Sequence, residues 1–379
     1  MKILIVIDQY DNLSNGTTIS AKRFVDGLRK DGNEVQILST GKDEEDKVSL
    51  KTYRFPKIID KYFKANEMVF ARPDEEVMRN VFKDQDVIHF YMPFRLAKKG
   101  VKIAEEMHIP HTTAFHVQPE NITYAVGLGT NHIVNDKIYT YFRSYYNKFR
   151  HIHCPSNFIA SRLKEHGYTA KLHVISNGVG EEFKYDRKEK PEGLKDKIVI
   201  AMVGRYSPEK RQDVLIDAIK KSKYESKIQL VLAGKGQCYE EYKNKTQELT
   251  NKAILKFYPK NELVNLLSYT DIYVHSADAE IEAISCLEAI ACGNVPIISN
   301  SNESATVQFA MDEDSLFEHG NSDDLARKID YFLDNSKILE EKRKAYSEFA
   351  NKFRIENSVK LMEEMFREEI EDYKKLENK

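Results

Sequence analysis

The sequence predicts an α/β protein built as two doubly wound halves. Apolar runs of strand length alternate with stretches of helical periodicity in both halves, which is typical of parallel sheets covered on both faces. At 379 residues the chain also exceeds what one hydrophobic core usually organises. We therefore expect domains at 1–177 and 178–356, with ligands bound where the strands end.

The first half begins with the apolar run KILIVID, which is expected to be a buried strand and not a signal peptide. Gly16 follows it and precedes a helix predicted from about Thr17 to Lys30. Gly16 does not complete a G-x-G-x-x-G pattern, so a dinucleotide site has little support, and a helix N-terminus facing the ligand is expected instead. Further strands are predicted in EVQILST, LKTYRF, DVIHFYMP, HTTAFHV, HIHCPS and LHVISNG.

A polar stretch from Asn177 to about Lys197 is interpreted as the linker to the second half. The strands predicted after it are KIVIAMVG, IQLVLAGKG, AILKFYP, DIYVHSA and VPIISN. Near the end of the chain, Val359, Met362 and Phe366 recur at helical spacing and predict a helix with one apolar stripe.

The residues AEIEAISCLEAIACGNVPI, from Ala279 to Ile297, contain the first candidate site. Apolar spacing predicts a helix from Ile284 that is stopped by Gly293. Glu288 then lies beside a core-facing stripe, where a carboxylate needs hydrogen-bond donors such as a ribose diol. Glu280 precedes the helix, whose first N–H groups, at Ala283, Ile284 and Ser285, are suited to a pyrophosphate. A solvated Glu280 and a Glu288 paired with a lysine are the alternative.

A second candidate site follows the first strand of the second half, in GRYSPEKRQDVLIDA. This strand ends at Gly204, so Arg205 and Lys210 are placed to reach a bound diphosphate. Fixed cations there would stabilise the charge that grows on a leaving diphosphate. The alternative is that both are ordinary surface cations near the start of a helix.

These two motifs, in this order, resemble the nucleotide-sugar signature of the retaining glycosyltransferases of family four. The resemblance implies the GT-B fold, with two Rossmann-like domains facing a central cleft and a last helix, 357–379, that returns to the first domain. It also implies that His116 lies close to the donor sugar. Ala283 stands where many members have glycine, and this departure lies in the segment that contacts the sugar hydroxyls. The stretch looks most like bacterial enzymes that glucosylate or galactosylate diacylglycerol.

The resemblance implies a UDP-sugar as donor substrate, and we expect a reaction that needs no metal or other cofactor. Arg205, Lys210 and the helix N-terminus supply positive charge at the phosphates, and no covalent nucleophile is evident on the donor side. Gly234 and Tyr258, at the ends of two further strands, are expected to contact the nucleotide. A turn without a ligand explains them equally well.

The acceptor is expected to bind the first domain. Gln118 and Glu120 follow His116 and are assigned to the acceptor side. The segment 138–154 interleaves aromatic residues with Arg143, Lys148 and Arg150, a combination that suits an anionic membrane surface, although its aromatics could equally pack in the core. A second basic aromatic stretch covers residues 51–64.

The composition limits location and partners. Net charge is −2 and no nucleic-acid-binding module is evident, so nucleic acid is not an expected partner. Four cysteines without disulfide or zinc spacing indicate reduced thiols in the cytoplasm. No apolar run has the roughly 20 residues of a membrane span. We expect a cytoplasmic protein, peripheral on the inner face of the membrane.

Together these observations predict a retaining hexosyltransferase that moves glucose from UDP-glucose to a lipid such as diacylglycerol. One alternative is an enzyme that acts on a capsule, teichoic-acid or protein-linked glycan. The other is a non-catalytic GT-B subunit that binds a partner.

Overall fold

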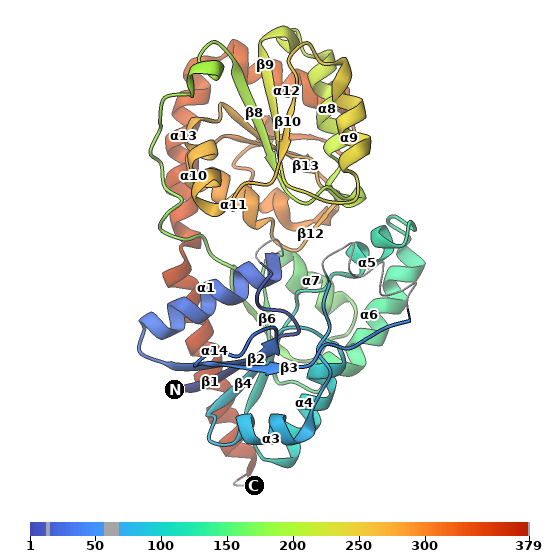
Figure 1. Cartoon of the computed structure of the whole chain (residues 1–379), viewed down its shortest axis with the longest axis vertical. Coiled ribbons are helices and arrows are strands. Elements are labelled where there is room, and N and C mark those ends of the chain that lie inside the picture. Colours follow the sequence, from blue (N-terminus) through green and yellow to red (C-terminus); the bar gives the residue numbers. More distant parts are fainter. Residues whose placement is uncertain (13–15, 57–67, 378–379) are drawn as a thin grey trace. The chain divides into compact units, whose positions relative to one another are not determined.

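The computed structural model describes residues 1–12, 16–56 and 68–377. The chain divides into two compact units (Figure 1). The first unit contains residues 1–122, 130–178 and 355–379, and the second contains residues 123–129 and 179–354. The short segment 123–129 therefore groups with the second unit, although the predicted domain boundary assigned it to the first. Its Tyr124 hydroxyl donates a hydrogen bond to Asp278, at 2.6 Å.

A seven-stranded parallel sheet forms the centre of the first unit, in the order β3-β2-β1-β4-β5-β6-β7. The order reverses between β1 and β4, which is the place where doubly wound sheets bind ligands. The strands are β1 (Lys2–Val6), β2 (Glu34–Thr40), β3 (Lys47–Leu50), β4 (Val87–Phe90), β5 (His111–Ala114), β6 (His151–Cys154) and β7 (Lys171–Val174).

Helices cover both faces of this sheet because successive side chains of a strand point in opposite directions. In β4, His89 contacts Phe366 on one face, whereas Phe90 contacts Phe82 and Phe149 on the other. The helices of this part of the chain are α1 (Gly16–Lys30), α3 (Glu75–Phe82), α4 (Arg95–Glu106), α5 (Pro119–Ala125), α6 (His132–Tyr146), α7 (Asn157–Glu165) and α14 (Ile355–Glu377).

The last helix, α14, packs beside α1 in the first unit. Its predicted stripe is buried at Val359, Met362 and Phe366, and these side chains join Phe24 of α1 and Ile5 of β1 in one core cluster. Burial of this apolar face, and not helix propensity alone, stabilises so long a terminal helix.

A six-stranded parallel sheet forms the centre of the second unit, in the order β10-β9-β8-β11-β13-β15, and β12 pairs separately with β14. The strands are β8 (Ile198–Val203), β9 (Ile228–Ala233), β10 (Ile254–Lys256), β11 (Ile272–His275), β12 (Ala279–Glu280), β13 (Pro296–Asn300), β14 (Glu303–Ser304) and β15 (Leu316–Glu318). The α-helices are α8 (Gln212–Lys221), α9 (Tyr239–Lys245), α10 (Lys260–Tyr269), α11 (Ile284–Ala291), α12 (Ser322–Asp334) and α13 (Ser336–Ala350).

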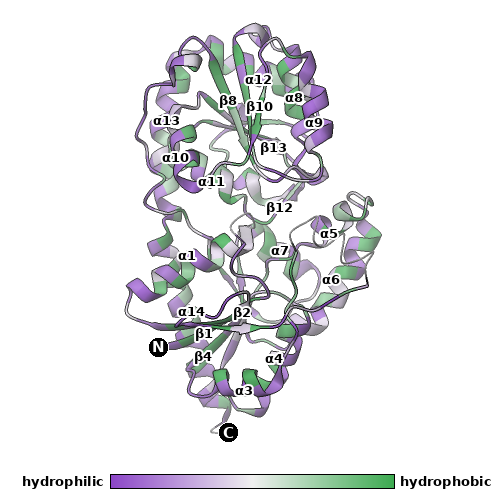
Figure 2. Ribbon diagram, viewed as in Figure 1, coloured by the Kyte–Doolittle hydropathy of each residue, from purple (hydrophilic) through white to green (hydrophobic). Residues whose placement is uncertain are grey.

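Short 3₁₀ turns complete the second unit. They are η1 (Glu192–Leu194), η2 (Pro208–Lys210), η3 (Glu225–Lys227), η4 (Thr246–Glu248), η5 (Ala305–Phe309), η6 (Glu313–Ser315) and η7 (Asn351–Phe353). Figure 2 shows β8 in hydrophobic colours, as expected of a strand buried on both faces. The predicted linker is wrong in part, because Val179 and Phe183 are fully buried in the core of the second unit.

None of the described helices combines the length and the apolar character needed to cross a membrane.

All four cysteines are free thiols with buried side chains.

Candidate active site

The candidate donor site in the second unit is assembled at the carboxyl ends of β8 and β11 and at the start of α11. The Ser285 hydroxyl donates to the Val203 carbonyl at 2.9 Å, which fixes the N-terminus of α11 beside the end of β8. The structure thus brings the predicted Gly204–Arg205 segment and the predicted Ala283–Ser285 segment together. Parallel strands favour this arrangement because their carboxyl ends lie at one edge of the sheet.

Lys210 and Glu280 form an ion pair in this site, although 70 residues separate them in the chain. Lys210 ends η2, and Glu280 ends the short strand β12. His275, the last residue of β11, contacts the same carboxylate oxygen through its Nε2 at 3.0 Å. Burial alone would raise the pKa of Glu280, but Lys210 and His275 outweigh it and lower the pKa to about 2. Glu280 is therefore ionised throughout the neutral range.

A polar chain continues from His275 to the start of α11. The Tyr273 hydroxyl lies 3.3 Å from Nδ1 of His275 and donates to the Ser285 hydroxyl at 3.2 Å. Burial raises the pKa of Tyr273 well above its ordinary value, so its hydroxyl keeps its proton. These bonds hold Glu280 and the helix N-terminus in a fixed relation.

Arg205 lies at the same edge of the sheet with its side chain half exposed. Its Nη2 contacts Oε1 of Glu209 at 3.0 Å, and the Ser207 hydroxyl donates to the same oxygen at 2.6 Å. Glu209 is buried, so it anchors one edge of the guanidinium. Arginine has five N–H donors, so this contact leaves others for a phosphate.

The helix α11 begins at Ile284, as its apolar spacing predicts. Ala283 precedes it with φ 64° and ψ 66°, the left-handed region that favours glycine. The alanine therefore keeps the backbone conformation that a glycine would adopt without strain. Glu288 lies one turn into α11 and is buried. Glu280 is buried as well, so the alternative of a solvated carboxylate does not apply to it.

Gly234 is required by the protein's own backbone. It follows β9, and a Cβ atom at this position would lie 1.9 Å from the Gly204 carbonyl oxygen. Gly236 likewise approaches the backbone of Tyr206. This close approach positions Gly204 and Arg205, so Gly234 acts on the site through its neighbours.

We expect Gly234→Ala to destabilise the second unit by about 1–3 kcal/mol, because neither backbone can move away freely. Urea unfolding should show a lower midpoint than in the wild type. Gly193→Ala is the matched control, since no atom lies within 4 Å of a Cβ there. Equal midpoints for the two variants would show that the backbone at Gly234 or Gly204 moves enough to accept a Cβ atom.

Tyr258 follows β10 and is half-buried, with the Lys256 ammonium 4.3 Å from its ring centroid. Its side chain packs against the small apolar cluster that contains Leu266 and Tyr269. The side chain of Tyr258 thus has a packing role. Contact between its backbone and the base of a nucleotide stays a prediction.

The first unit contains two further predicted residues of the donor side. His116 is buried and stacks on Tyr91, with ring centroids 5.2 Å apart. Burial, together with the neighbouring His153, lowers the pKa of His116 well below its ordinary value, so the imidazole is neutral at pH 7. Its Nε2 has no hydrogen-bond partner among the residues that the structure describes. Gly16 begins α1 and is exposed.

Four of the residues assigned to the acceptor or membrane side are buried or bonded within the protein. Gln118 and Glu120 are buried, and Glu120 accepts a hydrogen bond from Tyr139 at 3.2 Å. Arg143 donates to the His166 carbonyl at 3.0 Å. Arg150 forms an ion pair with the buried Glu369 and lies over the ring of Tyr373. Both arginines are therefore engaged within the protein.

Most aromatic residues of the segment 138–154 belong to the core, which was the alternative to membrane contact. The buried ones are Tyr139, Phe142, Tyr145, Tyr146 and Phe149, whereas Tyr141 is exposed. Lys148 instead lines a groove of about 360 Å³ between α4 and the end of α6. We call it the lysine groove; its other lining residues are Lys98, Lys99, Val101, Lys102, Ser144 and Tyr145. In the second basic stretch, 51–64, residues 57–64 lie outside the described residues.

Two buried polar residues of this site were not identified from the sequence. His275 ends β11, and Asp278 accepts hydrogen bonds from Arg211 at 3.3 Å and from Tyr124 at 2.6 Å. Polar residues directly after the apolar run DIYV were the available signal, since side chains at strand ends line ligand sites in parallel sheets.

Comparisons with known proteins agree with this architecture. Residues 14–183 match the family described as Glycosyltransferase Family 4, and residues 184–353 match the family Glycosyl transferases group 1. The alpha-monoglucosyldiacylglycerol synthase of Streptococcus pneumoniae is 25% identical over 80% of this chain and 71% of its own.

Two solved structures are also similar. The chain superposes on Anabaena Alr3699/HepE in complex with UDP and glucose with a TM-score of 0.77, at 15% identity over 97% of this chain and 100% of that one. The catalytic domain of cholesterol-alpha-glucosyltransferase from Helicobacter pylori is 49% identical, over 41% of this chain and 98% of that one, with a TM-score of 0.40. Both halves of the sequence thus match glycosyltransferase families, and the chain belongs to the GT-B glycosyltransferases.

Proposed function

We propose that the protein transfers glucose from UDP-glucose, with retention of configuration, to a membrane lipid with a free hydroxyl such as diacylglycerol. The main support for a donor site is the buried cluster of Lys210, Glu280 and His275, which lies beside Arg205 and the N-terminus of α11. The similarity to the alpha-monoglucosyldiacylglycerol synthase supports glucose and a lipid acceptor.

In this proposal Arg205, Lys210 and the first N–H groups of α11 bind the donor diphosphate. Lysine has three donors, so Lys210 can hold Glu280 and a phosphate oxygen at the same time. Negative charge grows on the diphosphate as the bond to the sugar breaks. The cations are already fixed by Glu209 and Glu280, so little reorganisation is needed in the transition state.

The two glutamates are assigned to hydroxyl groups. Glu288 accepts hydrogen bonds from the ribose, and Glu280 accepts them from the glucosyl ring. Glu280 suits this role because its low pKa keeps it a pure acceptor at neutral pH. His116, neutral and with Nε2 lacking a partner among the described residues, is proposed to accept or donate one hydrogen bond to the sugar.

We propose no metal for this reaction. The acceptor hydroxyl attacks the anomeric carbon from the face that the diphosphate leaves, and a phosphate oxygen receives the acceptor proton. The positive charge that a divalent ion would supply is assigned to Arg205, Lys210 and α11.

Peripheral membrane contact is assigned to the lysine groove. Four lysines surround it, and the Tyr145 and Val101 side chains line its apolar part. Each cation near an anionic surface contributes roughly 1 kcal/mol. The groove is thus suited to phosphate groups of anionic lipids, and we place the protein on the inner face of the membrane.

Replacing Lys102 and Lys148 by glutamine should weaken binding to anionic vesicles by about 30-fold at low salt. Sedimentation with vesicles containing phosphatidylglycerol measures this. The control replaces Lys42 and Lys83, which are exposed in the same unit. Equal losses in both pairs would indicate a general charge effect and would remove the groove from the proposal.

Two alternatives remain testable against the lipid proposal: a glycan or protein acceptor, and a non-catalytic subunit. Release of UDP should be measured from UDP-glucose, UDP-galactose and UDP-N-acetylglucosamine, each with diacylglycerol vesicles, sterol vesicles or soluble glycans. The proposal expects release from UDP-glucose that depends on diacylglycerol. Dependence on a soluble glycan would favour the first alternative. Binding of UDP without turnover under every condition would favour the second.

A further inference from the structure

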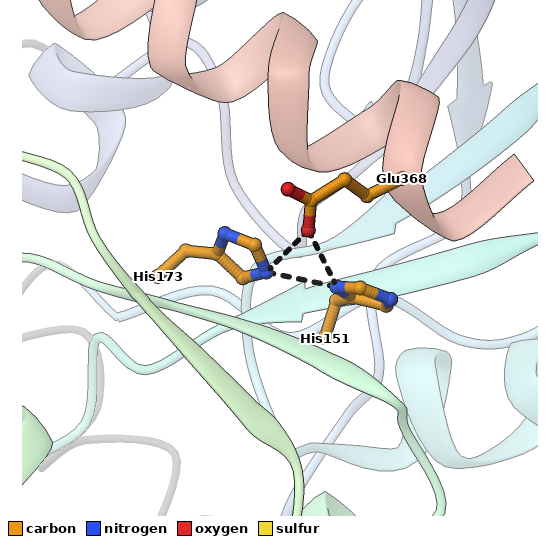
Figure 3. Close-up of side chains that lie close together, drawn as sticks. All are labelled: His151, His173 and Glu368. Atoms are coloured by element: carbon orange, nitrogen blue, oxygen red, sulfur yellow. Dashed lines mark hydrogen bonds and ion pairs between the residues drawn. The ribbon is translucent and has the colours of Figure 1, made fainter. Parts of the chain in front are cut away.

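Two histidines and a glutamate converge in the first unit, and none of them belongs to the proposed donor site. His151 belongs to β6, His173 to β7, and Glu368 to α14, and Figure 3 shows the three side chains pointing toward one another. Nδ1 of His151 lies 2.8 Å from Nε2 of His173. Oε2 of Glu368 lies 3.9 Å from the first nitrogen and 3.8 Å from the second. Among the described residues, this is the one group of three such ligands.

These separations match the size of a zinc site. A triangle with these sides has its centre about 2.1 Å from each corner, and Zn–N and Zn–O bonds are about 2.0–2.2 Å long. Two imidazoles and one carboxylate are a ligand set that zinc accepts, with a water completing the tetrahedron. Without an ion the two imidazole nitrogens are hydrogen-bonded to each other, so they must move apart by about half an ångström to become ligands of a tetrahedral ion.

The surroundings prepare His151 as a ligand. Its second nitrogen, Nε2, faces the carboxylates of Asp372 at 3.4 Å and Glu369 at 3.7 Å. A carboxylate on the far nitrogen keeps the proton there and directs the lone pair of Nδ1 toward the metal, an arrangement common to metal-bound histidines.

We propose that His151, His173 and Glu368 bind one zinc ion, which fastens α14 to the edge of the first sheet. β7 is the edge strand of that sheet, and β6 is its neighbour. The ion would therefore join three elements of the first unit, the third of which comes from the end of the chain. The zinc site would form whether or not the protein transfers a sugar.

Lys171 competes with the ion in the metal-free protein. Its ammonium contacts Oε2 of Glu368 at 2.5 Å, and its side chain is exposed. Exposed ion pairs are weak, so zinc can displace this lysine at little cost. Lys171→Gln should consequently bind zinc about two- to fivefold more tightly than the wild type.

The test is calorimetric titration of the full-length, chelator-treated protein with Zn²⁺. The wild type should bind one equivalent. His173→Gln and Glu368→Gln each remove one ligand and should weaken binding at least about 100-fold. Glu364→Gln, an exposed glutamate on the same helix, is the matched control and should bind as the wild type does. Bound Co²⁺ should show the visible absorption of a tetrahedral site, which the two ligand variants should lose.

Two outcomes would overturn the proposal. One is the absence of saturable binding by the wild type in a folded state verified by circular dichroism. The other is equal zinc binding by the wild type, His173→Gln and Glu368→Gln, which would place the ion elsewhere. The four buried cysteines are not expected to compete for it.

Discussion

Lys210→Met should lower kcat by about 10²- to 10³-fold, the usual effect of removing one fixed donor from a developing negative charge. It should also destabilise the protein, because Glu280 is buried and would lose its ion-pair partner. Breaking such a pair costs about 3 kcal/mol. Turnover and unfolding must therefore be measured on the same variant.

A double variant separates these two effects. Lys210→Met with Glu280→Gln removes both charges, so most of the lost stability should return while turnover stays low. Urea unfolding and UDP release measure the two quantities. If the double variant regained turnover along with stability, the single variant would have failed by unfolding, and Lys210 would not act on the diphosphate.

The pH dependence of stability gives an independent check of the pair. In the wild type the pKa of Glu280 is lowered to about 2, from 4.5 in the unfolded chain. The ion pair therefore adds to the free energy of unfolding above pH 4.5, and this addition is lost as the pH falls toward 2. In Lys210→Met, burial dominates and raises that pKa. The free energy of unfolding of the variant should therefore fall further below that of the wild type at about pH 8 than at about pH 5. A difference between the two proteins that does not change with pH would contradict the charge assignment.

Glu288→Gln should weaken UDP binding by about 10- to 100-fold, because a hydrogen bond to a charged group contributes about 1.5–3 kcal/mol. The effect should be confined to affinity. Ribose contacts are the same in the ground and transition states, so kcat at saturating donor should change little.

Calorimetric titration with UDP measures this change. Glu341→Gln, an exposed glutamate on α13 of the same unit, is the control and should bind UDP normally. If Glu288→Gln bound UDP with unchanged affinity, the ribose assignment would be wrong, and the buried carboxylate would have a structural role.

Helix positions and their buried faces follow from the sequence because they depend on the spacing of apolar residues close together in the chain. The start of α11 at Ile284 follows from apolar spacing, and the buried stripe of α14 follows from the same periodicity. The two parallel sheets follow from the alternation of strand and helix patterns.

Contacts between distant residues were not available from such patterns. Lys210 and Glu280 were each predicted as site residues, but their ion pair depends on how η2 and β12 meet in the fold. Arg150 was expected at a membrane surface, whereas it pairs with Glu369, 219 residues away. A charged residue in an aromatic-rich segment has the same sequence signature in both situations.

Gly234 illustrates a different limit. Its place after a strand suggested close approach of a ligand, but the structure shows that the Gly204 carbonyl occupies the space of a Cβ. Sequence alone indicates that a glycine is needed for space or for backbone freedom, and it does not identify the neighbour.

Transfer of radiolabelled glucose from UDP-glucose into vesicles that contain diacylglycerol, followed by organic extraction, tests donor and acceptor in one experiment. We expect label in a lipid product, formed by the wild type and nearly absent with Lys210→Met/Glu280→Gln. Sterol vesicles run in parallel would reveal another lipid hydroxyl as acceptor. Label that enters a soluble glycan or protein and no lipid would contradict the proposed acceptor. Failure to consume UDP-glucose with any acceptor would contradict the donor assignment itself.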